Sequence, residues 1–345
     1  MMSWIPYRLS HDTGQCAAMI LFPEQDWSAV VARLQASRHV MLTTHCNSDA
    51  DGIGSELALF HTLRHMGVQV SMFNRDVVPR ICRYLPGAEL IQVGEHPDVS
   101  TVDTVVALDA GAKSRLGFAD EVFAGKVLIN IDHHASNPDY GDINVVNADY
   151  CATGAMIFDL IQHLGQPLCK ASAEGIYAAV LTDTSSFHLD RVNADVHRMT
   201  AELIEAGAEP FAAAEAIYNS QPLARLTLLT QALQTLSIKD DGRSAWMYVT
   251  QAMLDEAGAS LEDTEGFIDV ICTIEGVEIL VFVRPERDQR WKVSFRGKAG
   301  RDVGAVATSL GGGGHKYAAG CAVSGSLEDV YAKVGQVVRA AFASV

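Results

Sequence analysis

Residues 40–55 read VMLTTHCNSDADGIGS: a short apolar run, then a histidine and two aspartates, then the start of a helical pattern. The run VMLTT, at residues 40–44, has the length and composition of a buried strand. Apolar residues at helical spacing follow over residues 54–66. A strand that passes directly into a helix predicts one repeat of a parallel α/β sheet.

The same alternation of apolar runs and amphipathic stretches continues through the first half of the chain. Near-continuous apolar strands separated by helices are typical of a parallel sheet with helices on both faces. We therefore predict an α/β domain, in which ligands bind at the carboxyl ends of the strands. The strands are expected at residues 40–44, 68–73, 105–108, 127–131 and 178–181, and the helices at 28–36, 54–66, 152–164 and 194–206.

The second half of the chain has a different pattern. Residues 210–236 are rich in Ala and Leu at helical spacing and predict a helical connector. The segments after it predict a smaller α+β domain, with strands at 246–250, 278–284 and 291–295 and helices at 264–273, 303–310 and 327–342. We divide the chain into a first domain at 25–195, a connector at 196–240 and a second domain at 241–345. Residues 1–18 are expected to lie outside the fold, with Met19 as an alternative start.

Composition narrows the function classes. The 345 residues include 26 Lys and Arg against 42 Asp and Glu, a formal charge of −16. This acidity disfavours binding to long duplex nucleic acid, because such binding depends on Lys and Arg neutralising phosphates. No apolar run reaches the ~20 residues of a membrane-spanning helix, so no membrane partner is expected. The seven cysteines are scattered and contain no C-x-x-C, which favours reduced thiols in the cytoplasm.

Aspartates and histidines follow the ends of four predicted strands. His45, Asp49 and Asp51 follow the first, Asp109 ends the third, and Asp183 follows the run at 178–181. Residues 132–134, Asp-His-His, end the strand at 127–131. Any one Asp at a strand end is more often a helix cap or a turn former. Four such positions at one sheet edge instead favour a site for Mn²⁺ or Mg²⁺, since carboxylates and imidazoles without thiolates suit these ions. Two ions could bind phosphate oxygens and stabilise a leaving oxygen.

The second domain contains a candidate anion site. Gly311–Gly314 forms a four-glycine run whose backbone N–H groups are not screened by side chains. His315 follows the run, and Arg296 lies upstream in a basic stretch, residues 284–301, with a local charge of +5 from seven basic and two acidic residues. A flexible loop and a solvated hairpin are the alternatives. Arg115, just after Asp109, is placed either to reach the substrate or on the surface.

These motifs together resemble the DHH phosphoesterase family. The segments THCNSDADGIGS, VALDAG, IDHHASN and AVLTDTSSF occur in the order of that family's motifs, and RGK…GGGGHKYAAGC resembles its DHHA1 substrate-binding domain. The resemblance covers about residues 25–345. It is strongest to the stand-alone NrnA-like group of oligoribonucleases and pAp phosphatases. The family's usual first motif has Pro and Gly where this chain has Ser48 and Ala50, so we expect altered loop stiffness with the ligand positions retained.

The resemblance implies the roles of the site residues. It implies that one metal is bound by His45 and Asp49, the second by Asp51 and His133, and that Asp109 and Asp183 contribute to both or bridge them. Asp109 and His134 are the implied catalytic residues, with His134 at the scissile phosphate or leaving group. Asp132 is implied to orient the histidines. The candidate substrate-binding residues are Arg115, Arg296, Gly312, Gly313, Gly314 and His315.

The expected activity is hydrolysis of short oligoribonucleotides or dinucleotides to nucleoside monophosphates, with removal of the 3′-phosphate of pAp as a further reaction. Two Mn²⁺ ions are the expected cofactors, with Mg²⁺ or Co²⁺ as alternatives, and a homodimer is a possible state. The alternatives within the enzyme class are a RecJ-like single-strand DNA exonuclease, a cyclic-dinucleotide phosphodiesterase and an inorganic pyrophosphatase. The DHHA1-like glycine motif argues against the last. A non-catalytic nucleotide sensor is the alternative from another class, and the intact ligand positions argue against it.

Overall fold

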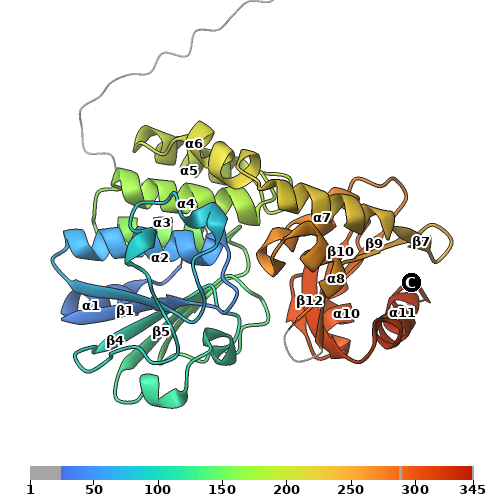
Figure 1. Cartoon of the computed structure of the whole chain (residues 1–345). Helices are drawn as coiled ribbons and strands as arrows, with labels where there is room; N and C mark the ends of the chain where they lie inside the picture. The colour runs from blue at the N-terminus through green and yellow to red at the C-terminus, as the bar shows by residue number, and fades with distance from the viewer. Residues whose placement is uncertain (1–24, 287–289, 344–345) are drawn as a thin grey trace, which may run out of the picture.

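The computed structural model of the chain describes residues 25–286 and 290–343. They form two lobes joined by a helical connector (Figure 1). The expectations about residues 1–18 and Met19 concern a segment outside the described residues. Among the described residues, no helix is both long and apolar enough to span a membrane.

The first lobe is built on a sheet of six parallel strands in the order β3-β2-β1-β4-β5-β6. Every residue of β1 and β4 is buried, which explains why these strands appear in the sequence as continuous apolar runs. Because all six strands run the same way, their carboxyl ends share one edge of the sheet. The bounds are β1 His39–Thr44, β2 Gln69–Asn74, β3 Gln92–Val93, β4 Thr104–Leu108, β5 Val127–Asp132 and β6 Ile143–Val146.

The predicted α/β class is confirmed, and the two faces of the sheet are covered differently. Helices α1 (Ser28–Ala36), α2 (Ala50–His65) and α3 (Thr153–His163) pack with the strands into the main core. The opposite face carries a smaller core, covered by loops and by the 3-10 helices η3 (Lys113–Leu116) and η4 (Asp120–Val122). The edge that carries the candidate site is therefore supported by α-helices from one side.

The prediction of a strand at residues 178–181 is wrong. These residues belong to helix α4 (Lys170–Asp183), which packs on α2 outside the sheet (Figure 1). The two helices approach closely at a pair of glycines: a Cβ on Gly54 would lie 2.2 Å from the carbonyl oxygen of Gly175. Helix α4 is also covered by α5 (Ala194–Glu205) and α6 (Pro210–Ala214). A helix buried on several sides has a continuous apolar run that resembles a buried strand.

The connector and the second lobe follow. In the segment predicted to be a connector, α5, α6 and a π-helical turn at Glu215–Asn219 pack into the first lobe's core, whereas α7 (Leu223–Gln234) packs into a core of the second lobe. The second sheet has the order β11-β12-β10-β9-β8-β7 and is antiparallel except between β8 and β9. Its strands are β7 Ser237–Lys239, β8 Ser244–Tyr248, β9 Ile279–Pro285, β10 Arg290–Gly297, β11 Gly313–Gly314 and β12 Ala318–Ser324.

Helices cover both faces of the second sheet. One core contains α8 (Gln251–Ala257) and α9 (Phe267–Ile271), and the other contains α10 (Val303–Ser309) and α11 (Leu327–Ala343). The single helix predicted at 264–273 is instead two short pieces, η6 (Leu261–Thr264) and α9, separated at Gly266, whose φ is +76°. Strand β12 was not predicted, because its sequence AAGCAVS consists mostly of small residues.

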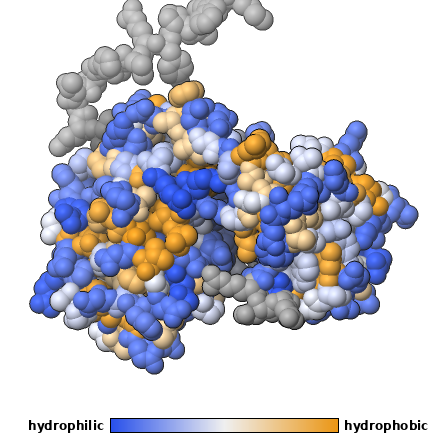
Figure 2. Space-filling model, viewed as in Figure 1, coloured by the Kyte–Doolittle hydropathy of each residue, from blue (hydrophilic) through white to orange (hydrophobic). Residues whose placement is uncertain are grey.

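A polar network joins the two lobes. Arg80, in the 3-10 helix η1 (Arg80–Cys82) of the first lobe, donates from Nη1 to Asp263 Oδ1 in η6 at 2.9 Å and from Nη2 to Gln221 Oε1 at 2.9 Å. Its backbone N–H also donates to the Glu262 carboxylate. The surface is hollowed between the lobes in Figure 2. The network therefore sets how the second lobe faces the first across this hollow.

Candidate metal centre

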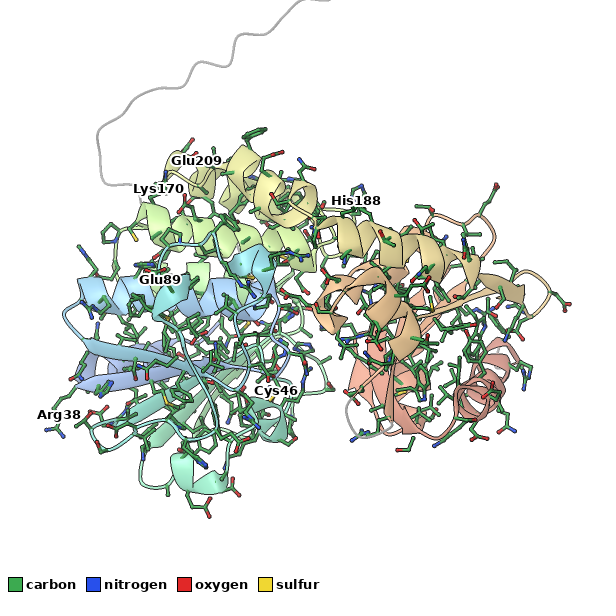
Figure 3. The ribbon with its side chains drawn as sticks, viewed as in Figure 1. Arg38, Cys46, Glu89, Lys170, His188 and Glu209 are labelled. Atoms are coloured by element: carbon green, nitrogen blue, oxygen red, sulfur yellow. The ribbon has the colours of Figure 1, made fainter. Side chains whose placement is uncertain are left out.

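The carboxyl edge of the first sheet brings the predicted acids and histidines together. His45 follows β1, Asp109 follows β4 and Asp132 ends β5. Asp183 comes from the end of α4 rather than from a strand. Cys46, next to His45, lies on the side of the first lobe that faces the second (Figure 3). Among the described residues, potential ligand atoms form four overlapping groups, and the atoms of each group lie within 4.8 Å of one another. Two of these groups contain the predicted ligands, His45, Asp49 and Asp109 in one set and Asp51, His133 and Asp183 in the other.

The first set is organised by the start of α2. His45 Nε2 lies 3.4 Å from Asp109 Oδ2 and 3.8 Å from Asp49 Oδ2. Asp49 is the N-cap of α2, and its Oδ1 accepts from the backbone N–H groups of Asp51 and Gly52 at 3.0 and 3.2 Å. Its Oδ2 is the oxygen that faces His45. Gly52 is required here, since a Cβ would lie 2.2 Å from Thr44 Oγ1.

The second set is organised by the start of α3. His133 Nε2 lies 3.4 Å from Asp183 Oδ2 and 3.5 Å from Asp51 Oδ2. The backbone N–H groups of Thr153 and Gly154 donate to the Asp51 carboxylate at 2.7 and 2.8 Å. These donors fix the orientation of a buried carboxylate, and they could not be foreseen from the sequence because residues 51 and 153 are far apart in the chain.

Asp109 faces both sets. Its Oδ2 points to His45, and its Oδ1 lies 3.7 Å from His133 Nε2. Asp109 has a φ of +56°, in the left-handed region that non-glycine residues seldom occupy. Such backbone strain persists only where the surroundings enforce it, and it is concentrated at functional sites. The residue is therefore placed where one carboxylate could bridge two ions.

The electrostatics of the cluster favour added positive charge. Burial raises the pKa of Asp51 well above its ordinary range, and the charges of Asp109 and Asp183 raise it further. Burial, with Asp109 adding to it, also raises the pKa of Asp183 to about 6. Burial lowers the pKa of His45, but the neighbouring carboxylates of Asp109 and Asp49 outweigh this and bring it to about 10. The raised pKa values mean that the cluster binds protons to reduce its negative charge. Divalent cations would neutralise the same carboxylates.

The donor set fits a hard or borderline divalent ion. It consists of imidazole nitrogens and carboxylate oxygens, and no thiolate belongs to either set. The nitrogen-to-oxygen separations of 3.4–3.8 Å are longer than hydrogen bonds. The side chains therefore converge without satisfying one another, which is the arrangement that shared ligands of an ion have.

His134 lies beside these sets and is held by Asp132. His134 Nδ1 is 2.7 Å from Asp132 Oδ1, and Asn137 Nδ2 donates to Asp132 Oδ2 at 2.6 Å. Burial lowers the pKa of His134, but the hydrogen bond to Asp132 and the negative charges of Asp109, Asp132 and Asp183 together outweigh this and raise it. Asp132 is thus placed as the resemblance implies for an orienting residue, although its partner is His134 and not both histidines.

His315 crosses from the second lobe into this site. Its ring stacks on that of His134, with centroids 4.6 Å apart and an interplanar angle of 19°, and lies 5.0 Å from that of His133. Burial lowers the pKa of His315 to about 2, and the neighbouring His134 and His133 contribute to the shift. Arg191 Nη2 lies 3.2 Å from His315 Nδ1. Arg191 was not predicted as a site residue. The only signal in the sequence is its position, eight residues after Asp183.

The glycine run before His315 is shaped by close backbone approach. A Cβ on Gly312 would lie 2.1 Å from the carbonyl oxygen of Gly320, whereas one on Gly313 would meet nothing within 4 Å. Gly314 has a φ of +136°. Arg296, on β10, donates from Nε to Asp269 Oδ1 at 2.9 Å within its own lobe. Its predicted role in binding substrate stays a prediction.

Basic side chains from both lobes face each other beside the metal residues. Arg115 Nη2 lies 3.0 Å from His45 Nδ1. Burial lowers the pKa of Lys292, and the charges of Arg284 and Arg115 add to this. Glu265 partly offsets the charge, since its Oε1 lies 2.7 Å from Arg284 Nη2 and 3.8 Å from Lys292 Nζ. We call Arg115, Arg284 and Lys292 the basic cluster.

A buried carboxyl behind the site was also missed in the sequence. Glu56, on α2, accepts from Asn74 Nδ2 at 2.6 Å through Oε2, and its Oε1 has no hydrogen-bond partner among the described residues. Asn74 Oδ1 accepts from the backbone N–H of Thr44 at 3.0 Å, directly before His45. Burial raises the pKa of Glu56 to about 8. The only signal in the sequence for Glu56 was an acidic residue at a position where the helical pattern predicts a buried face.

Two family models and a curated relative match this chain. The model of the "DHH family, N-terminal domain" matches residues 39–181, and the model of the "DHHA1 domain" matches residues 246–342. A relative in Thermus thermophilus, named bifunctional oligoribonuclease and PAP phosphatase NrnA, is 33% identical over 87% of this chain and 89% of its own length.

Two solved structures have a similar fold. An exopolyphosphatase-related protein from Bacteroides fragilis has a TM-score of 0.79 at 24% identity, over 91% of this chain and 94% of that one. RecJ from Thermus thermophilus in complex with Mn²⁺ has a TM-score of 0.52 at 15% identity, over 92% of this chain and 54% of that one. At these identities the likeness concerns the fold.

Proposed function

The chain belongs to the DHH family and carries a DHHA1 domain, and from that premise we propose that it is a phosphoesterase that hydrolyses short oligoribonucleotides or dinucleotides to nucleoside monophosphates. Removal of the 3′-phosphate of pAp is the proposed second reaction. The Thermus relative, with both activities in its name, supports this choice of substrates. We retain the division into a catalytic domain at 25–195, a connector at 196–240 and a substrate-binding domain at 241–345.

The observation that carries the proposal is the position of Asp109. Its two carboxylate oxygens face different histidines, at 3.4 Å from His45 and 3.7 Å from His133. We assign His45, Asp49 and Asp109 to one ion and Asp51, His133 and Asp183 to the second, with Asp109 shared. Mn²⁺ is the proposed ion, with Mg²⁺ and Co²⁺ as alternatives. Two such ions would polarise the scissile phosphate and lower the pKa of the attacking water.

The protein's own groups complete the chemistry. The hydrogen bond to Asp132 raises the pKa of His134, so this imidazole can retain a proton and deliver it to the leaving oxygen. His315 and the glycine run at 312–314 bind the phosphate from the second lobe. The basic cluster binds a further phosphate, because its three cations outnumber the carboxylates of Glu265 and Glu286 that act on Lys292. Arg296 remains a proposed contact to the nucleotide end.

Turnover with Mn²⁺ on a panel of substrates tests the proposal. The panel contains pAp, a 5′-phosphorylated dinucleotide, a cyclic dinucleotide, a long single strand and pyrophosphate. Preference for the dinucleotide or for pAp is expected. Preference for the long strand would favour a RecJ-like exonuclease, and binding without any hydrolysis would favour a nucleotide sensor. The six described cysteines are all free thiols, which supports a cytoplasmic location as part of the proposal. A homodimer is also proposed, and light scattering tests it.

A further inference from the structure

An arginine of the first lobe contacts the histidine that the second lobe brings to the metal centre. Arg191 lies in the segment between α4 and α5, and its Nη2 is 3.2 Å from Nδ1 of His315. Arg191 is not among the residues of the two candidate metal sets. The contact therefore needs an explanation other than metal binding.

The chemistry of the pair fixes which nitrogen of His315 carries the proton. A guanidinium group has five N–H donors, no acceptor, and stays charged in proteins. Nδ1 of His315 must therefore be the acceptor, with its lone pair directed at Arg191. A neutral imidazole with a bare Nδ1 carries its hydrogen on Nε2. His315 accordingly has one remaining polar group, an Nε2–H donor, and no other side-chain hydrogen bond of His315 is found within residues 25–286 and 290–343.

The position of the His315 ring shows which acceptor its Nε2–H group can reach. The ring stacks on His134 at 4.6 Å and lies 5.0 Å from His133, so it stands over the metal centre. We propose that Arg191 is a positioning residue that holds His315 in its Nε2–H form, so that His315 donates a hydrogen bond to a phosphate oxygen at the metal centre. The phosphate as the partner of His315 rests on the proposed function. The assignment of the proton to Nε2 does not depend on that function.

The contact between Arg191 and His315 also argues against His315 as a metal ligand. The ring nitrogens of His133, His134 and His315 can be grouped within 4.8 Å, which by composition resembles a site for a third metal ion. A nitrogen ligand needs a free lone pair. In His315, Arg191 occupies the lone pair of Nδ1 and a hydrogen occupies Nε2, so neither nitrogen is available. The geometry assigns His315 to the substrate and not to a metal.

The segment that carries Arg191 is tightly folded, which makes it suitable for positioning. Ser185, Ser186 and Phe187 all have left-handed φ angles, of 49°, 60° and 65°. Thr184 Oγ1 accepts from the backbone N–H of Phe187 at 3.0 Å, and Ser186 Oγ lies 2.8 Å from the hydroxyl of Tyr218 in the connector. Asp183 and Arg191 therefore begin and end one compact turn, which links a candidate metal ligand to the orientation of His315.

Nitrogen NMR of the histidine rings tests the proposal directly. The full-length protein is labelled with ring-¹⁵N histidine and loaded with Mg²⁺, because Mn²⁺ is paramagnetic, and the His315 signals are assigned by their loss in His315→Gln. The expected wild-type spectrum has a proton on Nε2 and none on Nδ1. A proton on Nδ1, or on both nitrogens, would overturn the proposal whether or not the protein hydrolyses any substrate.

Two variants of similar size then separate positioning from packing. Arg191→Gln can still donate to Nδ1, whereas Arg191→Glu can only accept and should move the proton from Nε2 to Nδ1. The Glu variant is expected to lose about 10²-fold in kcat/KM on a dinucleotide, the range for losing one donor to a reacting phosphate. The Gln variant should retain most of this activity, and Arg198→Gln, at an exposed position on α5, should match wild type.

Metal content supplies the remaining check. Both Arg191 variants and His315→Gln should bind as much Mg²⁺ as wild type. Wild-type kcat/KM in Arg191→Glu, or the loss of one metal equivalent in His315→Gln, would overturn the assignment of His315 to the substrate. If the wild-type protein hydrolyses nothing in the panel while Nε2 carries the proton, the proposed function fails and the effect of Arg191 on His315 stands.

Discussion

Replacing Glu56 by glutamine should stabilise the protein, by an amount that grows with pH. Glu56 is fully buried in α2, and burial raises its pKa from 4.5 to about 8. Below pH 4.5 the carboxyl is protonated in both the folded and the unfolded state, and it costs nothing. Between these two pKa values only the unfolded state releases the proton, so the folded state loses stability as pH rises. Above pH 8 the cost is constant.

The size of the effect follows from the pKa shift. One pKa unit corresponds to 1.36 kcal/mol. At about pH 7 the difference is about 2.5 units, which gives about 3 kcal/mol, and above about pH 8 it reaches about 5 kcal/mol. Glutamine has the hydrogen-bonding pattern of the protonated carboxyl, because its oxygen can still accept from Asn74 Nδ2. It removes the ionisation and leaves the contact.

Urea unfolding of the metal-free protein at about pH 5, 7 and 9 is the assay. At about pH 7 the gain of about 3 kcal/mol corresponds to a rise of roughly 6–12 °C in Tm for a lobe of this size. Glu89→Gln is the matched control, since Glu89 is exposed on the first lobe (Figure 3), and it should change little at any pH. If Glu56→Gln does not raise the free energy of unfolding at about pH 9, the pKa of Glu56 is not raised in the folded state, and the reasoning is refuted.

Three further predictions concern the site and its surroundings. Asp109→Ala should abolish hydrolysis and lower the Mn²⁺ content measured by elemental analysis, with the fold retained by circular dichroism; Mn²⁺-dependent turnover in this variant would exclude a bridging role. Ser185→Gly should raise the free energy of unfolding by about 1 kcal/mol, because glycine adopts the left-handed φ of 49° without strain, and an unchanged urea midpoint would contradict this. Gly312→Ala should lower Tm and raise KM, because its Cβ would lie 2.1 Å from the Gly320 carbonyl oxygen, while Gly313→Ala, with open space around its Cβ, should keep the wild-type Tm; equal Tm values for the two would show that the close approach is not rigid.

The strands that position the site could be predicted because they are buried on both faces. β1 and β4 have no exposed residue, so an apolar run followed by an acid marks both the strand and its carboxyl end. The same reasoning failed for Asp183. A fully covered helix gives an apolar run as well, and only the close contact between Gly54 and Gly175 shows that α4 packs on another helix.

Contacts between distant segments could not be predicted from one sequence. Arg191 reaches His315 across the two lobes, and Thr153 reaches Asp51 through backbone N–H groups that any residue carries. Glu56 was missed for a different reason. Its burial depends on how α2 packs against Asn74, and periodicity alone does not distinguish a buried acid from one at the helix surface.

The order of the site residues along the chain has a consequence for biosynthesis. All six residues assigned to ions lie between His45 and Asp183, ahead of the connector, and the sheet that positions them is complete at β6. Domains generally fold from the amino end as they emerge from the ribosome. The nascent first lobe can therefore capture its ions before β7 to β12 have been translated.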